Sequence, residues 1–104
     1  MIRRSVPLAV LFLSAAAVDA APTTRPEDLG TIVQRCQVAG SVAYAAVSER
    51  NAGADEAKVV MDVGWMHDQG AHIVYEVFHD TRFATARPEE ALWSVTHDCI
   101  EAQK

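Results

Sequence analysis

The chain has 104 residues, of which 50% are hydrophobic, and it carries a formal net charge of −5 at pH 7. This length allows one small domain at most. The acidic balance, without any cluster of basic residues, argues against nucleic acid or an anionic membrane surface as a partner.

The first 20 residues have the pattern of a signal peptide. Arg3 and Arg4 precede an apolar run from Val6 to Val18, and a small residue, Ala20, stands at the expected cleavage position. The run is too short for a membrane-spanning helix, which needs about 20 apolar residues. Retention as a short N-terminal anchor is the less favoured alternative. We therefore expect an exported protein, periplasmic or secreted, with no stable membrane span after cleavage.

The remaining chain divides into a disordered lead-in, residues 21–25, and a single helical domain, residues 26–104. The lead-in is polar and contains Pro22. Cleavage after residue 20 leaves seven Lys and Arg against thirteen Asp and Glu, so the net charge becomes −6.

The first helix is predicted to begin at Pro26, because proline suits the first helical position, and to end by Gly53. At about 100° per residue, eight residues fall on one stripe, which is typical of an amphipathic helix: Leu29, Ile32, Val33, Cys36, Ala39, Gly40, Ala43 and Val47. The middle of the stripe consists of small residues, which allow a second helix to approach closely: Ala39, Gly40 and Ala43.

The two cysteines, Cys36 and Cys99, are expected to form a disulfide. Each lies on the apolar stripe of its own predicted helix. In a small exported chain, two cysteines are more often a disulfide than free thiols or metal ligands. On the chain-entropy model, this long-range link contributes about 4 kcal/mol to stability.

Two further helices are predicted in the middle of the chain. The second helix starts near Asp55 and is apolar on almost all sides, so burial on several sides is expected, with Gly64 as a close-contact point or a weak spot. Residues 67–70 form a break, or a kink if the second and third helices are continuous. The segment Ala71–His79 is rich enough in β-branched residues to form a strand, but a lone strand would have no partner, so a helix is favoured.

The last helix is predicted to begin at Pro88, with acidic residues in its first turn. The preceding loop, Asp80–Arg87, is expected to fold Phe83 back onto the core. The fold class is therefore an all-α bundle of three to four helices stapled by one disulfide. The predicted core consists of Leu29, Ile32, Val33, Ala39, Ala43, Val47, Val60, Met61, Val63, Val74, Phe78, Leu92 and Val95.

Three residues of the third predicted helix, His72, Glu76 and His79, resemble a set of metal ligands. However, His72 and His79 are about 10 Å apart along the helix axis, which is long for a shared ion. We favour a solvated face and predict no metal site. A b-type haem held by Met66 and His97 is less favoured still, and the Cys-x-x-Cys-His motif of c-type haem does not occur. No cofactor is predicted.

No set of nucleophile, base and orienting group can be assigned, so no catalytic residue and no enzymatic activity are predicted. The predicted partner surface is Trp93 and Ile100 on the last helix. Helical geometry places both about 110° to 120° from the stripe centred on Val95 and Cys99. Phe83 could cover Trp93. If they are exposed, Trp with an aliphatic neighbour is the composition of a binding hot spot, for a partner or for self-association.

Three short features, Cys36-x3-Gly40, Arg50-x2-Gly53 and a terminal helix carrying Cys99, resemble small exported helical proteins of proteobacteria, known mostly as uncharacterised sequences. The resemblance implies a helical fold with one disulfide and implies no activity or site residue. In size, export and a single helix-to-helix disulfide, the chain is also similar to periplasmic acid-stress chaperones.

Three classes of function fit these features. The favoured one is a non-enzymatic interaction module, such as an inhibitor, immunity factor or accessory subunit, of an unknown protein partner. The second is a periplasmic acid-stress chaperone, because acid would change the net charge from −6 to about +11 and self-repulsion could expose apolar surface. The third is a small-ligand or metal binder.

Overall fold

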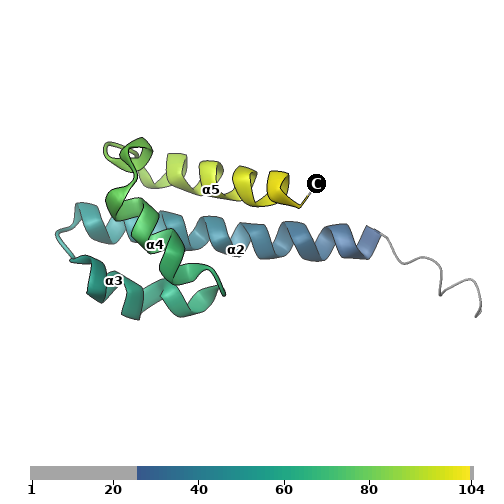
Figure 1. The fold of residues 1–104 in the computed structure, drawn as a ribbon, viewed down its shortest axis with the longest axis horizontal. Coiled ribbons are helices and arrows are strands. Elements are labelled where there is room, and N and C mark those ends of the chain that lie inside the picture. The colour runs from purple at the N-terminus through teal and green to yellow at the C-terminus, as the bar shows by residue number, and fades with distance from the viewer. Residues whose placement is uncertain (1–25, 104) are drawn as a thin grey trace, which may run out of the picture. The chain divides into compact units, whose positions relative to one another are not determined.

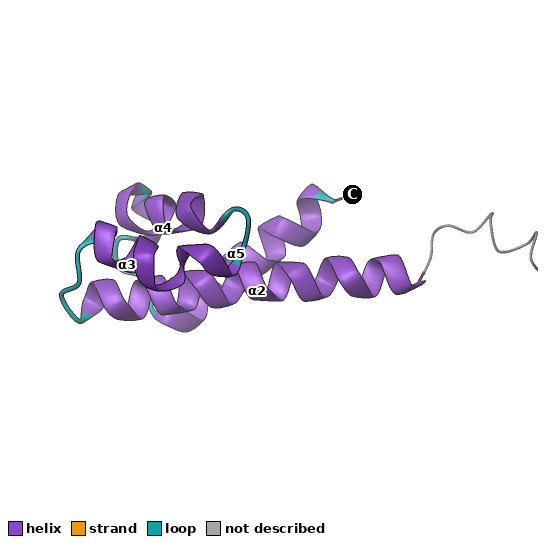
Figure 2. Ribbon diagram, turned by 90° about the horizontal axis from the view of Figure 1, so that it is seen from below, coloured by secondary structure: helices purple, strands orange, loops and turns teal. Residues whose placement is uncertain are grey.

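The computed structural model describes residues 26–103, and all regular secondary structure in this range is helical (Figure 1 and Figure 2). The predicted all-α fold is confirmed, with four α-helices rather than three. The predicted signal peptide and lead-in, residues 1–25, lie outside the described residues. The elements are α2 (Pro26–Asn51), α3 (Glu56–Val63), the 3-10 helix η1 (Gly64–Met66), α4 (Gly70–His79), the 3-10 helix η2 (Thr81–Phe83) and α5 (Pro88–Ala102).

From Ile32 onward the described chain forms one compact unit, and its core draws on all four helices. Ala39, Ala43 and Val47 recur every four residues, so they share one face of α2, as predicted. Val63, Val74 and Val95 are also buried as predicted, whereas four predicted core residues are only half-buried: Ile32, Val60, Phe78 and Leu92. The buried apolar residues missing from the prediction are Val42, Ala46, Val59, Ile73, Val77 and Ala91.

Leu29 and Val33 were expected in the core, but both side chains are exposed. The buried face of α2 begins only at Cys36, the residue that joins α2 to α5. Helix α5 ends at Ala102, less than one turn past its own cysteine, so Val33, which precedes Cys36 by one turn, lies at the edge of the α2–α5 pairing. An apolar stripe predicts which residues can be buried, but the length of the partner helix decides which of them are.

Met61 was also predicted in the core, and this prediction is wrong, because its side chain is 79% exposed. Helix α3 buries Val59 and Val63, which lie one turn apart on the same face. Met61 stands midway between them in sequence and therefore points away from the core. Since α3 is apolar on almost all sides, periodicity alone does not select its buried face.

Helices α2 and α5 run antiparallel (Figure 1), and two of the contacts between them are especially close. Cys36 bonds to Cys99 with the Cα atoms 5.4 Å apart, and Gly40 lies against Leu92 and Thr96. A Cβ at position 40 would collide with Thr96 Oγ1 and lie 2.8 Å from the Leu92 carbonyl oxygen. The predicted disulfide and the predicted close approach at the small residues are both confirmed.

Helices α3 and α4 form a hairpin through η1, placed over the C-terminal half of α2 (Figure 1 and Figure 2). The Asp55 side chain begins α3 by accepting a hydrogen bond from the Lys58 N–H at 2.9 Å. Gly64 ends α3, and a Cβ on Gly70 would collide with the Gly64 carbonyl oxygen. The backbone of Gly64 is thus at a close contact, but the position that requires glycine is Gly70, since the nearest atom to a Cβ on Gly64 itself would be Val60 Cγ1 at 3.3 Å.

Arg50, near the end of α2, holds the ends of two other elements. Its Nη1 donates hydrogen bonds to the carbonyl oxygens of Val77 in α4 and of Phe83 in η2, each at 2.8 Å. Gly53 follows with φ of 100°, a conformation that favours glycine. Phe83 is buried, so the predicted folding of this loop onto the core is confirmed.

Within residues 26–103, none of the helices has both the length and the apolar composition required to span a membrane.

Candidate functional site

An open groove lies between α4 and α5, with Ala39 of α2 contributing to its lining. We call it the α4–α5 groove. Its volume is about 350 Å³. The lining is apolar in one part and polar in another: Ala39, Ile73, Val95, Cys99 and Ala102 supply the apolar atoms, and His67, Gln69, His72, Glu76, Arg82, Asp98 and Gln103 supply the polar ones. Cys99 is held in the disulfide and is not a free thiol. The described residues that line the groove include no serine, threonine or tyrosine.

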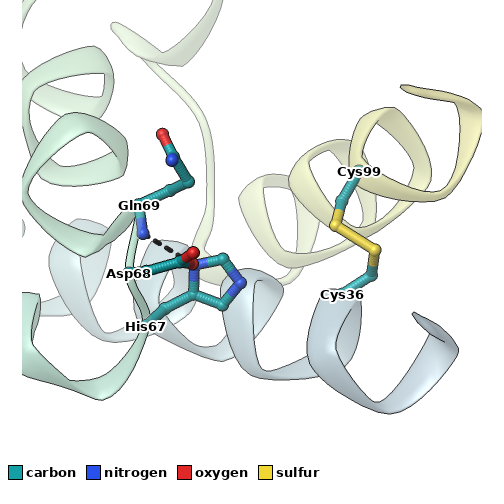
Figure 3. The surroundings of a disulfide bond; sticks show 5 residues. All are labelled: Cys36, His67, Asp68, Gln69 and Cys99. Atoms are coloured by element: carbon teal, nitrogen blue, oxygen red, sulfur yellow. Dashed lines mark hydrogen bonds and ion pairs between the residues drawn. A yellow bond between two sulfur atoms is a disulfide. The ribbon is translucent and has the colours of Figure 1, made fainter. Parts of the chain in front are cut away.

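His67 is the most deeply placed polar group of the groove, with a side chain only 8% exposed. Its Nδ1 accepts a hydrogen bond from the Gln69 N–H at 2.9 Å and lies 3.0 Å from Asp68 Oδ1. Its Nε2 is buried without a hydrogen-bond partner in the protein. Figure 3 shows the Nε2 edge of the ring directed toward the side on which the Cys36–Cys99 disulfide lies.

Arg82 organises the charged part of the groove. Its Nη1 donates to Asp98 Oδ2 at 2.6 Å, while Nη2 lies 3.8 Å from Glu76 Oε1 and Nε lies 3.6 Å from Asp80 Oδ2. The hydrogen bond from Arg82 lowers the pKa of Asp98, and the same contact raises the pKa of Arg82. The guanidinium also lies 4.4 Å from the centre of the Phe83 ring. One cation thus joins η2 to both α4 and α5.

The three residues considered as metal ligands do not form one site. His72 Nε2 pairs with Glu76 Oε2 at 3.2 Å, as expected for residues one turn apart. His79 instead pairs with Glu56 Oε1 of α3 at 2.7 Å and stacks on Tyr75. Among residues 26–103, no group of three or more His, Cys, Asp or Glu side chains is placed to hold a metal ion.

Both tryptophans of the chain are exposed, Trp93 at 70% and Trp65 at 76%. Phe83 therefore does not cover Trp93. On α5, Trp93 lines a shallow hollow of about 530 Å³ with Glu90, Ser94, His97 and Asp98; we call these five residues the Trp93 surface. Ile100, predicted beside Trp93, is half-buried.

Trp65 lies in a second exposed region, on η1. Its indole N–H donates to the Asp62 carbonyl oxygen at 3.0 Å, and Met61, one turn earlier, is also exposed. Sequence reasoning did not identify this region, because Met61 was assigned to the core.

Sequence reasoning also left out His67, Arg82 and Asp98. His67 falls in the predicted break between helices, where no periodicity indicates the direction of a side chain. Arg82 lies in the predicted loop, and its contact with Asp98 depends on how that loop folds onto α5. Arg50 appeared only as part of a sequence resemblance, without a structural role.

Comparisons with known protein families, with curated proteins and with solved structures find no match for this chain.

Proposed function

We propose that this chain is an exported, non-enzymatic helical module that binds another protein through the Trp93 surface. The observation that carries the proposal is the 70% exposure of Trp93 on a helix fixed by a disulfide. Trp side chains are usually buried for most of their area, and they are enriched at the centres of protein interfaces. A rigid helix that presents one loses little conformational entropy on binding.

Export is part of the proposal. The signal-like residues 1–20, the Cys36–Cys99 disulfide and the lack of a membrane-spanning helix in residues 26–103 are compatible with it.

The charge around Trp93 favours a basic partner. Glu90 and Asp98 line the hollow, and Glu89 and Glu101 are exposed on the same helix. Asp98 is already bonded to Arg82 and Glu90 lies near Arg87, so Lys or Arg side chains of a partner would add to these existing pairs, and a cation could lie against the indole face. Ile100, being half-buried, adds apolar area at the edge of the surface.

The proposal is tested by affinity capture from a native periplasmic extract with the disulfide intact. Trp93→Ser is the test variant and Trp65→Ser is the matched control, because both side chains are similarly exposed. We expect Trp93→Ser to lose the protein captured by the wild type, and Trp65→Ser to keep it, with melting temperatures nearly unchanged. Ile100→Thr should weaken capture less. The proposal is wrong if Trp93→Ser captures the same protein as the wild type. Analytical ultracentrifugation of the same variants measures their oligomeric state and distinguishes self-association from binding to another protein.

An acid-activated chaperone is the second candidate, because the ion pairs of Arg82 with Glu76 on α4 and Asp98 on α5 depend on ionised carboxylates. Protonation below pH 4 would weaken these ion pairs while the net charge becomes strongly positive. Protection of a client enzyme from aggregation at low pH, with dye-detected exposure of apolar surface, would support this candidate. A folded monomer without such protection would remove it.

A further inference from the structure

The α4–α5 groove contains a polar atom that the fold leaves without a partner. His67 Nε2 is buried and makes no hydrogen bond to the protein, although nearly all buried polar atoms in folded proteins have a partner. The groove beside it has a volume of about 350 Å³, which is within the range of small-molecule pockets and far larger than one water molecule requires.

The hydrogen bonds at the other ring nitrogen determine what Nε2 presents. The Gln69 backbone N–H points at Nδ1 from 2.9 Å, so Nδ1 acts as the acceptor (Figure 3). The Asp68 carboxylate is close to Nδ1 as well, but its side chain is 79% exposed and water can solvate it. With the Nδ1 lone pair engaged, the proton of the neutral ring lies on Nε2. The groove therefore presents a buried N–H donor.

The charges of the groove restrict the ligand further. Two carboxylates, Glu76 and Asp98, outnumber one guanidinium, Arg82, which is already bonded to Asp98 at 2.6 Å. An anionic ligand would meet an excess of negative charge and a cation that is already paired. A ligand that offers only an ammonium group would place a donor against the Nε2–H donor. An uncharged oxygen acceptor satisfies both conditions.

We propose that the α4–α5 groove binds a small uncharged molecule whose carbonyl or hydroxyl oxygen accepts the hydrogen bond from His67 Nε2. The apolar body of this molecule packs against Ile73, Val95 and the disulfide at Cys99, which form the apolar part of the lining. This site differs from the partner-binding proposal in its apolar lining, and Asp98 is the residue that lines both the groove and the Trp93 surface.

The first test needs no ligand. Long-range proton–nitrogen NMR of the oxidised, labelled protein reports which ring nitrogen of His67 carries the proton at neutral pH. We expect an unprotonated Nδ1 and a protonated Nε2. A proton on Nδ1 alone would overturn the proposal, since Nε2 would then be an acceptor.

The second test uses two probes of equal shape, isovaleramide and isovalerate, followed through the methyl signals of Ile73, Val95 and Ala102. We expect saturable shifts with the amide and roughly tenfold weaker binding of the carboxylate, because its negative charge would lie near Glu76 and Asp98. No saturable shift with isovaleramide would mean that the groove holds only water. Equal or tighter binding of isovalerate would refute the charge argument.

The third test is His67→Asn, which keeps an acceptor for the Gln69 N–H, while its shorter amide does not place a donor at the position of Nε2. The matched control is His79→Asn, an exposed histidine of α4 that lines neither the groove nor the Trp93 surface. We expect roughly tenfold weaker isovaleramide binding for His67→Asn and unchanged binding for His79→Asn. Unchanged binding by His67→Asn would overturn the proposal. If this variant does not fold, the proposal still stands or falls on the two wild-type measurements, the position of the ring proton and the binding of the two probes.

Discussion

Helix α5 is joined to α2 by one covalent bond and one very close backbone approach, whereas the α3–η1–α4 hairpin is held by buried apolar side chains and by Arg50. Helix α4 buries Ile73, Val74 and Val77 within ten residues. Helix α5 is longer but buries only Ala91, Val95 and Thr96. A covalent attachment thus lets a helix keep most of its surface, including Trp93, available to solvent. The hairpin must use its apolar residues to stay in place.

Removal of the disulfide should have the largest effect, and it should fall mainly on α5. For Cys36→Ala combined with Cys99→Ala, we expect a loss of about 4 kcal/mol in the free energy of unfolding, because the link closes a long loop. Urea unfolding followed by circular dichroism measures the loss, and hydrogen exchange should show faster exchange in α5 than in α4. Equal destabilisation of both helices would contradict the comparison.

Arg50→Met should be the corresponding change for the hairpin. It removes two charge-assisted hydrogen bonds and leaves the Val77 and Phe83 carbonyl oxygens without their donor. We expect a loss of about 3 kcal/mol in unfolding free energy. Arg35→Met, on an exposed position of α2, is the control and should change little. If Arg50→Met loses no more unfolding free energy than Arg35→Met, water satisfies the Val77 and Phe83 carbonyl oxygens as well as Arg50 does.

Gly40→Ala tests the close approach between α2 and α5 in the presence of the disulfide. The added Cβ would meet Thr96 Oγ1 and the Leu92 carbonyl oxygen, so the helices must separate. We expect a loss of about 2 kcal/mol. Gly30→Ala is the matched control, because nothing lies within 4 Å of its added Cβ, and helix propensity predicts a gain of up to about 1 kcal/mol. If both variants change the free energy of unfolding by the same amount, α5 can move away from α2 at position 40 without a loss of stability.

Acid should weaken the ion pair between Arg82 of η2 and Asp98 of α5. Since the hydrogen bond from Arg82 lowers the pKa of Asp98 in the folded protein, its contribution is present above the unfolded pKa, near pH 4, and disappears as pH falls through the lower folded value. The pair is half-exposed, so we expect Asp98→Asn to lose less than about 1 kcal/mol at pH 7 and progressively less as pH falls through the lowered pKa of Asp98. Glu89→Gln is the control. A pH-independent difference would contradict this assignment.

The junction of α2 with α3 should respond to acid in the opposite direction, with the smallest effect. A hydrogen bond to Asp62 raises the pKa of Glu49, so the folded state takes up this proton more readily and gains stability as pH falls through the raised value. We expect Glu49→Gln to melt slightly higher than the wild type at pH 7, with the difference vanishing once Glu49 is protonated. A lower melting temperature at pH 7 would show that the ionised carboxylate is stabilising.

The two regions also differ in how well sequence predicts them. The small residues around Gly40 and the placement of Cys36 and Cys99 on apolar stripes predicted the α2–α5 pairing, because close contact and disulfide chemistry each demand particular residue types. The buried face of α3 was not predictable from a segment that is apolar nearly all round, as Met61 shows. His67 could not be placed, since its position depends on the Gly64–Gly70 contact that shapes the break. Helical geometry placed Trp93 and Ile100 away from the inward stripe of α5 but left open whether Phe83 covers Trp93, and it did not indicate that Ile100 is half-buried.

The sequence separation of 63 residues between the two cysteines has a consequence for the order of events during folding. The contacts within the α3–η1–α4 hairpin join neighbouring elements, and such contacts form early because little chain entropy is lost in closing short loops. The α2–α5 pairing must wait until the whole intervening chain is compact. We therefore expect the thiols to meet on a hairpin that is already assembled. The bond that contributes most to the finished fold is then formed last, and the close fit at Gly40 aligns the cysteines before oxidation.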